Sequence, residues 1–190
     1  MAGLRVIAGE HRGRRLATPA GRDTRPTADR VREAVFSILG PIGGVEVLDL
    51  FAGSGAMGIE ALSRGASSAT FVDRARPACD CIRANLDALG VSDHARVVCR
   101  DWRQALAADH ATGRFYGLCL IDPPYSVLAR IGDAIADALA PIVSPGGHVV
   151  VEGPASSPLP TLGVLPVADR TDRTYGSTRI TVIRVAEAGG

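Results

Sequence analysis

The chain has 190 residues, of which 46% are hydrophobic and 22% charged, and its formal net charge is only +1. A chain of this length suits one domain, and its apolar share supports a sizeable core and excludes a disordered protein. No apolar run approaches the roughly 18 residues that span a bilayer, and the first residues lack the apolar segment of a signal peptide. We therefore expect a cytoplasmic protein without a membrane segment.

The N-terminal part of the chain is basic. Residues 1–40 hold eight Arg against four acidic residues, whereas the remainder has a net negative charge. Such a cluster suits contact with phosphate groups, and a solvated surface is an equally good alternative. Residues 4–16 alternate loosely around Gly9 and Gly13, which predicts a β-hairpin. We expect this basic arm to span residues 1–26, ahead of a main domain over residues 27–190.

A predicted helix opens the main domain. Thr27 is its expected N-cap, and apolar residues at helical spacing continue to Leu39, where Gly40 and Pro41 end the helix. Strand patterns then alternate with helical patterns, one of which is a short helix at about residues 104–109. The expected strands are residues 45–51, 68–73, 95–100, 116–122 and 148–152.

The C-terminal third contains no long helical pattern after residue 140. Pro145-Gly146-Gly147 indicates a turn, and the tail predicts strands near residues 162–167 and 178–185, joined by a turn at Gly176. The alternation along the whole chain predicts an α/β fold with a mostly parallel sheet and helices on both faces. The last two strands would form an antiparallel hairpin at the sheet edge.

The four cysteines do not predict a metal site. None forms a C-x-x-C pair, and no His pair has the spacing of zinc ligands. Cys99 and Cys119 lie within strand patterns, so we expect them to be buried thiols. No disulfide and no metal are expected.

Residues 46–58, EVLDLFAGSGAMG, combine a strand, a glycine-rich turn and the start of a helix. Gly53, Gly55 and Gly58 have the G-x-G-x-x-G spacing of nucleotide-binding turns, in which a ligand approaches the backbone closely. Asp49 lies four residues before Gly53 and would disfavour a pyrophosphate and favour a cationic ligand such as S-adenosylmethionine. The alternative is a structural acid that accepts hydrogen bonds from backbone N–H groups.

Three further acids follow successive predicted strands. In a parallel sheet the carboxyl ends of the strands lie along one edge, where ligands bind. Asp73 would accept hydrogen bonds from ribose hydroxyls, and Asp101 with Trp102 would meet an adenine amino group and flank its ring. For Asp73 and Asp101 the alternative is a helix N-cap. The third acid, Asp122, opens a motif of its own.

Asp122-Pro123-Pro124-Tyr125 predicts methylation of an amine attached to a ring. Such an amine is a poor nucleophile, so a site must hold both of its hydrogens and aim the nitrogen at the methyl group. The Asp122 carboxylate and the Pro123 carbonyl can accept those hydrogens, and proline stiffens the turn. Tyr125 offers a face on which an extruded base can stack, an interaction of about 1–3 kcal/mol. The alternative is a plain turn after a strand.

These motifs resemble a known family. Asp122-Pro123-Pro124-Tyr125 and the FAGSG turn at residues 51–55 look like those of the Rossmann-like amino-methyltransferases that use S-adenosylmethionine. The family resemblance is narrower still, to RsmD-type 16S rRNA guanine-N2 methyltransferases. It rests on RVIAG at 5–9, RGRRL at 12–16, RPT at 25–27, DRVRE at 29–33, FAGSGAMGIEALSRGA at 51–66 and Tyr175-Gly176.

The resemblance implies a seven-stranded sheet with an antiparallel last strand, preceded by an N-terminal β-hairpin. It implies S-adenosyl-L-methionine as cofactor and the N2 amine of guanine 966 of 16S rRNA as the methyl acceptor. We expect the target base to be held by residues 122–125. The expected cofactor-binding residues are Asp49, Phe51, Gly53, Ser54, Gly55, Asp73, Arg74, Asp101, Trp102 and Asp122. The expected RNA-binding residues are Arg5, Arg12, Arg14, Arg15, Arg25, Thr27 and Arg30.

Only the arm is basic, and the chain has no room for a separate RNA-binding domain. We therefore expect a monomer that needs its guanine displayed by an assembled or assembling 30S subunit. Alternatives remain at this stage. An adenine-N6 DNA methyltransferase would share the Asp122 motif, but a sizeable target-recognition insert is missing. Protein-glutamine methyltransferases usually carry Asn at position 122. A non-catalytic RNA-binding module would not need that motif intact.

Overall fold

The computed structural model of the chain describes residues 3–19, 26–156 and 163–187. Within these residues, seven strands form one sheet in the order β3-β2-β1-β4-β5-β7-β6. The strands are β1 (Glu46–Leu50), β2 (Ser68–Asp73), β3 (Ala95–Cys99), β4 (Tyr116–Ile121), β5 (Val143–Pro154), β6 (Val167–Tyr175) and β7 (Thr178–Val185). Strands β1 to β5 pair in parallel, whereas β7 is antiparallel to both of its neighbours. This arrangement confirms the predicted Rossmann-like α/β class.

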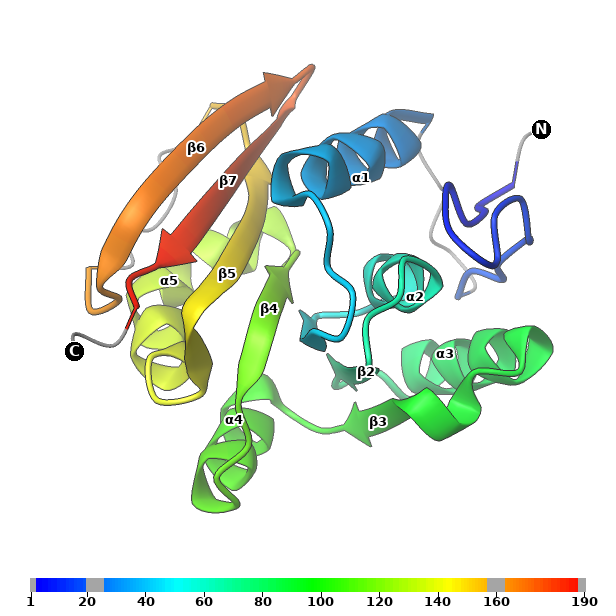
Figure 1. Ribbon diagram of the computed structural model, residues 1–190, viewed down its shortest axis with the longest axis horizontal. Helices are drawn as coiled ribbons and strands as arrows, with labels where there is room; N and C mark the ends of the chain where they lie inside the picture. Colours follow the sequence, from blue (N-terminus) through cyan, green and yellow to red (C-terminus); the bar gives the residue numbers. More distant parts are fainter. Residues whose placement is uncertain (1–2, 20–25, 157–162, 188–190) are drawn as a thin grey trace.

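The helices cover both faces of the sheet (Figure 1). They are α1 (Pro26–Leu39), α2 (Ala56–Ser63), α3 (Arg76–Leu89), α4 (Trp102–Ala111) and α5 (Tyr125–Leu139), with a 3-10 turn, η1, at Ser92–His94. Apolar side chains of α1, α2 and α3, such as Phe36, Ile59 and Ile82, form one core on the sheet. Leu106 of α4 and Ile135 of α5 belong to a second core on the opposite face. Strands covered on both faces need continuous apolar runs, which explains why β1 and β4 are almost entirely buried.

The chain order places the ends of β1 and β4 next to each other. From β1 the chain moves outward to β2 and β3, and it then returns to β4 on the other side of β1. Leu48 of β1 is in register with Thr70 of β2 and with Cys119 of β4. Open α/β sheets bind ligands at the carboxyl edge where the strand order reverses in this way. The residues that follow β1, β2 and β4 therefore lie at the edge where a ligand is expected to bind.

The N-terminal segment differs in two respects from the prediction. Residues 3–19 contain an antiparallel turn with a single bridge, between Arg5 and Arg15, rather than a hairpin of two strands. Helix α1 begins at Pro26, so Thr27 lies inside the helix and is not its N-cap. Proline suits the first turn of a helix because its missing N–H would have no intrahelical partner there.

Two predictions in the C-terminal third are wrong. Residues 145–147 are not a turn but part of β5, whose pairing with β4 is irregular between Tyr116 and Leu118. The strand expected near residues 162–167 is β6, which covers Val167–Tyr175 and is mostly exposed. An edge strand with polar side chains lacks the alternation that marks a half-buried strand. The turn predicted at Gly176 joins β6 to β7, as expected.

The cysteines form no disulfide among themselves. All four thiols are free, and Cys99 is half-buried rather than buried because β3 is an edge strand. No helix in the described ranges has the length and apolar character that crossing a bilayer requires.

Candidate active site

The glycine-rich turn after β1 has a special backbone. Among the described non-glycine residues, only Phe51 has a positive φ, at 66°. Gly53 and Gly55 also have positive φ values, 58° and 78°, in the region that side chains with a Cβ disfavour. Gly55 is the N-cap of α2 and makes no side-chain cap hydrogen bond. Helix α2 therefore begins at a turn with an unusual backbone, and such a conformation is typical of a ligand site.

The third glycine of the motif serves packing. A Cβ on Gly58 would lie 2.4 Å from Cε1 of Phe71, a β2 residue in the core. A Cβ on Gly55 would lie 3.1 Å from Cγ1 of Ile82 on α3. The spacing of the motif therefore combines a turn for a ligand with close packing of α2 on β2.

Asp49 is buried directly beneath this turn. Its side chain is 3% exposed, and Oδ2 accepts a hydrogen bond from the Gly58 N–H at 2.9 Å. Burial raises the pKa of Asp49 to about 7, the Gly58 hydrogen bond opposes this rise, and the carboxylates of Asp122 and Asp73 add to it. The structural alternative is thus present: Asp49 supports α2 through a backbone N–H. Its charge also lies near two other carboxylates, so the region disfavours an additional anion.

Asp73 connects the turn to the start of α3. Its Oδ2 accepts from the Gly53 N–H at 3.0 Å, and its Oδ1 accepts from the Ala75 N–H at 2.9 Å. The N-cap of α3 is Ala75, so Asp73 is not the cap itself. Each carboxylate oxygen keeps a further lone pair, and the side chain is half-buried. Asp73 can therefore still accept a hydroxyl hydrogen bond, while the neighbouring Arg74 is exposed.

The Asp101–Trp102 pair lies at the start of α4. Asp101 is the N-cap of α4, and its Oδ1 accepts from the Arg103 N–H at 2.9 Å. Trp102 is only 6% exposed and packs in the core beneath α4. The guanidinium of Arg103 lies 4.3 Å from the centroid of the Trp102 ring. Asp101 therefore caps a helix, as its alternative interpretation expects, and a contact of Asp101 and Trp102 with the cofactor stays a prediction.

Asp122 follows β4 at the same edge. Its side chain is exposed, and its N–H donates to the Leu50 carbonyl at 3.4 Å, beside the end of β1. Pro123 is buried, and Pro124 is the extended N-cap residue of α5, with φ −51° and ψ 136°. Tyr125 begins α5, but its side chain lies outside the described part of the structure. The structure therefore brings Asp122 together with the glycine turn, Asp49 and Asp73.

The predicted RNA-binding arginines lie on the surface. Arg5, Arg12, Arg14 and Arg15 of the arm are exposed, as is Arg30 on α1. The Nη2 atom of Arg14 donates to the Ala88 carbonyl at 2.6 Å. Arg25 and the side chain of Thr27 lie outside the described residues. The exposed arginines of the arm are accessible to a partner, and their contact with RNA stays a prediction.

Two buried polar residues were not predicted from the sequence. Glu60 of α2 is 0% exposed, and Asn85 of α3 is 4% exposed. Both contact the N-terminal arm, more than fifty positions away in the sequence. The available signal was the charge of Glu60 between Ile59 and Ala61, in a helix that is apolar on nearly all sides.

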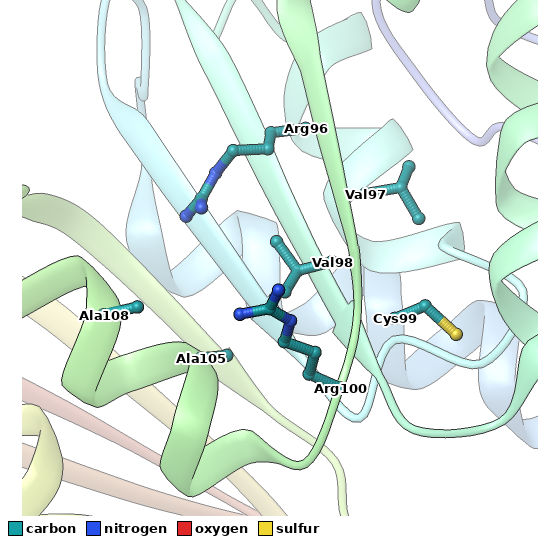
Figure 2. Close-up of a pocket in the computed structure, with 7 residues that line it drawn as sticks. All are labelled: Arg96, Val97, Val98, Cys99, Arg100, Ala105 and Ala108. Carbon is teal, nitrogen blue, oxygen red and sulfur yellow. The ribbon is translucent and has the colours of Figure 1, made fainter.

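A separate hollow of about 340 Å³ lies between β3 and α4 (Figure 2). Arg96, Val98 and Arg100 point toward α4, whereas Val97 and Cys99 point to the other side of the strand (Figure 2). The Arg96 guanidinium donates to the carboxylate of Asp109 at 2.6 Å. The lining of this hollow includes none of the predicted cofactor-binding residues. Within the described ranges, no group of three or more metal-binding side chains is present.

The chain is similar to known proteins in sequence and in fold. The model of the family called conserved hypothetical protein 95 matches residues 4–184. "Putative rRNA methyltransferase YlbH" of Bacillus subtilis is 40% identical, over 95% of this chain and 98% of that protein. "Ribosomal RNA small subunit methyltransferase D" of Escherichia coli K12 is 42% identical over 64% of this chain, and the match spans 60% of that protein. The solved structure of "Putative methyltransferase yhhF" from Escherichia coli has a TM-score of 0.80 and 30% identity, covering 98% of this chain and 100% of that one.

Proposed function

We propose, from the fact that this chain belongs to the family called conserved hypothetical protein 95, that it methylates the exocyclic N2 amine of a guanine in 16S rRNA with S-adenosylmethionine. The observation that carries the proposal is the position of Asp122-Pro123-Pro124 at the end of β4, beside the strained glycine turn after β1. The relatives named as rRNA methyltransferases support the RNA substrate class. Such a substrate assigns the reaction to the cytoplasm.

The residues of the turn fit the proposed cofactor. The positive φ values at Gly53 and Gly55 allow a ligand to approach the backbone closely. Asp73 already fixes the Gly53 N–H and can accept a ribose hydroxyl with a remaining lone pair. The nearby carboxylates of Asp49 and Asp73 favour a ligand with a sulfonium and an ammonium group over a pyrophosphate.

S-adenosylmethionine supplies the methyl group from its sulfonium when it is bound. The Asp122 carboxylate and the Pro123 carbonyl accept the two hydrogens of the guanine amine and orient its lone pair toward that methyl group. Methyl transfer to the nitrogen would leave the sulfur as the thioether of S-adenosylhomocysteine, and one of the two hydrogens held by Asp122 and Pro123 would pass as a proton to solvent. Orientation of the two reactants accounts for most of the acceleration in this scheme. Tyr125 is proposed as the platform on which the base stacks.

The proposed RNA substrate is presented by an assembled or assembling 30S subunit. The exposed arginines of the arm provide the phosphate contacts, and a monomer without a bound metal ion suffices for the reaction. Comparable methylation of a short naked RNA and of 30S particles would contradict the proposed dependence on the assembled subunit.

Nucleoside mass spectrometry of 16S rRNA from a deletion strain tests the activity. We expect loss of one 2-methylguanosine, restored by the wild-type gene. Unchanged 2-methylguanosine would overturn the proposal, and loss of N6-methyladenosine would identify the adenine-directed alternative.

The role of Asp122 can be tested separately. Asp122→Ala should abolish turnover and leave S-adenosylhomocysteine binding largely intact, because its carboxylate is assigned to the amine. Calorimetric titration and methylation of 30S particles measure the two properties. Asp93→Ala, at an exposed residue of η1, is the control and should retain both. If Asp122→Ala also fails to bind the cofactor product, the assigned role is wrong.

A further inference from the structure

Asn85 joins the N-terminal arm to the glycine turn. Its Oδ1 accepts from the Ala17 N–H at 2.7 Å, and its Nδ2 donates to the Ala17 carbonyl at 3.1 Å. The same Nδ2 donates to the Ser54 carbonyl at 3.0 Å. The Asn85 side chain is 4% exposed, and its hydrogen bonds therefore join two segments that are distant in the sequence.

The contact with Ser54 acts on a peptide group of the turn. The Ser54 carbonyl is held by Asn85, and the N–H of the same peptide, that of Gly55, donates to the Ala52 carbonyl at 2.7 Å. Both ends of this peptide group are therefore fixed, in a turn where Gly55 has a φ of 78°. Loss of Asn85 would leave the Ser54 carbonyl in the interior without this donor, so the peptide could rotate.

The contact with Ala17 acts on the arm. Upstream, residues 7–11 are held independently by α2: the Ile7 and Ala8 N–H groups donate to Glu60, and the His11 N–H donates to Ser63 Oγ at 3.0 Å. Ala17 is the last arm residue with such a described contact before the segment that leads to α1. The arm thus packs on α2 and α3, and among the described contacts its Ala17 end is the one that a side chain joins to the turn.

We propose that Asn85 is a positioning residue that couples order in the basic arm to cofactor binding at the glycine turn. This inference rests on the proposed function. A ligand that stabilises the observed turn also stabilises the hydrogen bonds between Asn85 and Ala17, and by thermodynamic reciprocity an arm held by its RNA substrate tightens the cofactor site. The basic arm then does more than attract phosphate groups, because its conformational order changes when the methyl donor binds.

The test compares Asn85→Ala with Ser63→Ala. Ser63→Ala removes arm contacts from α2 without touching the turn, so it is a matched control. Asn85→Ala should weaken S-adenosylhomocysteine binding about fivefold to tenfold in calorimetric titration, as expected for about one net hydrogen bond. Ser63→Ala should bind within twofold of wild type. Equal affinities of wild type and Asn85→Ala would overturn the proposal.

Hydrogen exchange gives a second readout that a merely structural role would not move. In the wild-type protein, S-adenosylhomocysteine should slow amide exchange in residues 51–58 and also in residues 14–17, and the arm response should vanish in Asn85→Ala. Protection of residues 51–58 alone refutes the coupling and leaves the cofactor site standing. Protection of neither segment refutes the proposed function as well. If Asn85→Ala does not fold, Asn85→Ser replaces it, and the wild-type measurement needs no variant.

Discussion

The two faces of the sheet each bury an acidic side chain and use it differently. On the α4 face, Asp109 is 2% exposed and binds Arg96 of β3 and the Tyr116 hydroxyl of β4. On the α2 face, Glu60 is 0% exposed and accepts backbone N–H groups from Ile7 and Ala8 of the arm. The first network joins elements within the sheet domain, whereas the second holds the arm against that domain. Similar burial of charge thus supports the fold on one face and the proposed RNA-binding segment on the other.

The largest expected effect comes from Asp109→Ala. The variant leaves the Tyr116 hydroxyl, donating at 2.7 Å in the wild type, without its acceptor in the core. The Arg96 side chain is 39% exposed and can turn to water. We expect a loss of about 2–3 kcal/mol in the free energy of unfolding, measured by chemical denaturation. The folded variant should keep its affinity for S-adenosylhomocysteine, and a weakened affinity would show that the α4 face also shapes the site.

A smaller global effect is expected for Glu60→Gln. The amide would keep one acceptor oxygen but would turn an NH₂ group toward donors that now bind a carboxylate, including Arg64 Nε at 2.8 Å. We expect about 1–2 kcal/mol of destabilisation and, by hydrogen exchange, at least tenfold faster exchange at residues 7 and 8.

Arg14→Ala is the control for the Glu60 variant. It removes an exposed arm contact and should change stability by no more than about 0.5 kcal/mol. Equal acceleration of exchange across the whole protein in Glu60→Gln would abolish the distinction between the two faces.

A further prediction concerns pH and Asp49, the buried acid of β1 whose Oδ2 accepts from the Gly58 N–H of α2. Because burial raises its folded-state pKa from 3.8 to about 7, the native protein holds this proton more tightly than the unfolded chain. Its contribution to stability is present at low pH and is lost as the pH rises through 7. Asp49→Asn keeps an acceptor for the Gly58 N–H and cannot ionise.

Denaturation of both proteins between pH 5 and 8 measures this effect. The stability of wild type relative to Asp49→Asn should fall as the pH rises. A difference that does not change with pH would mean that Asp49 is ionised throughout this range.

Local patterns were sufficient to predict the edge of the sheet at which the candidate site residues lie. Gly53, Gly55 and Asp122 could be placed because the turn, the strand end and the helix start are encoded by adjacent residues. The burial of Trp102 and the position of β6 could not be predicted in this way. Both depend on which distant elements pack against them in the folded protein. Glu60 and Asn85 were missed because their partners lie 53 and 68 positions away.

The polar character of β6 has a consequence for how copies of the protein meet one another. Among the described residues, β6 is the last strand of the sheet and pairs with β7 alone, so its outer backbone N–H and C=O groups can act as a template for another strand. Asp169, Arg170, Asp172 and Arg173 are carried by this edge strand. With a net charge of only +1, the protein has little overall repulsion between copies. Resistance to aggregation then depends on the water bound to a few charged side chains of β6. A strand of another copy would have to displace this water before it could pair with β6.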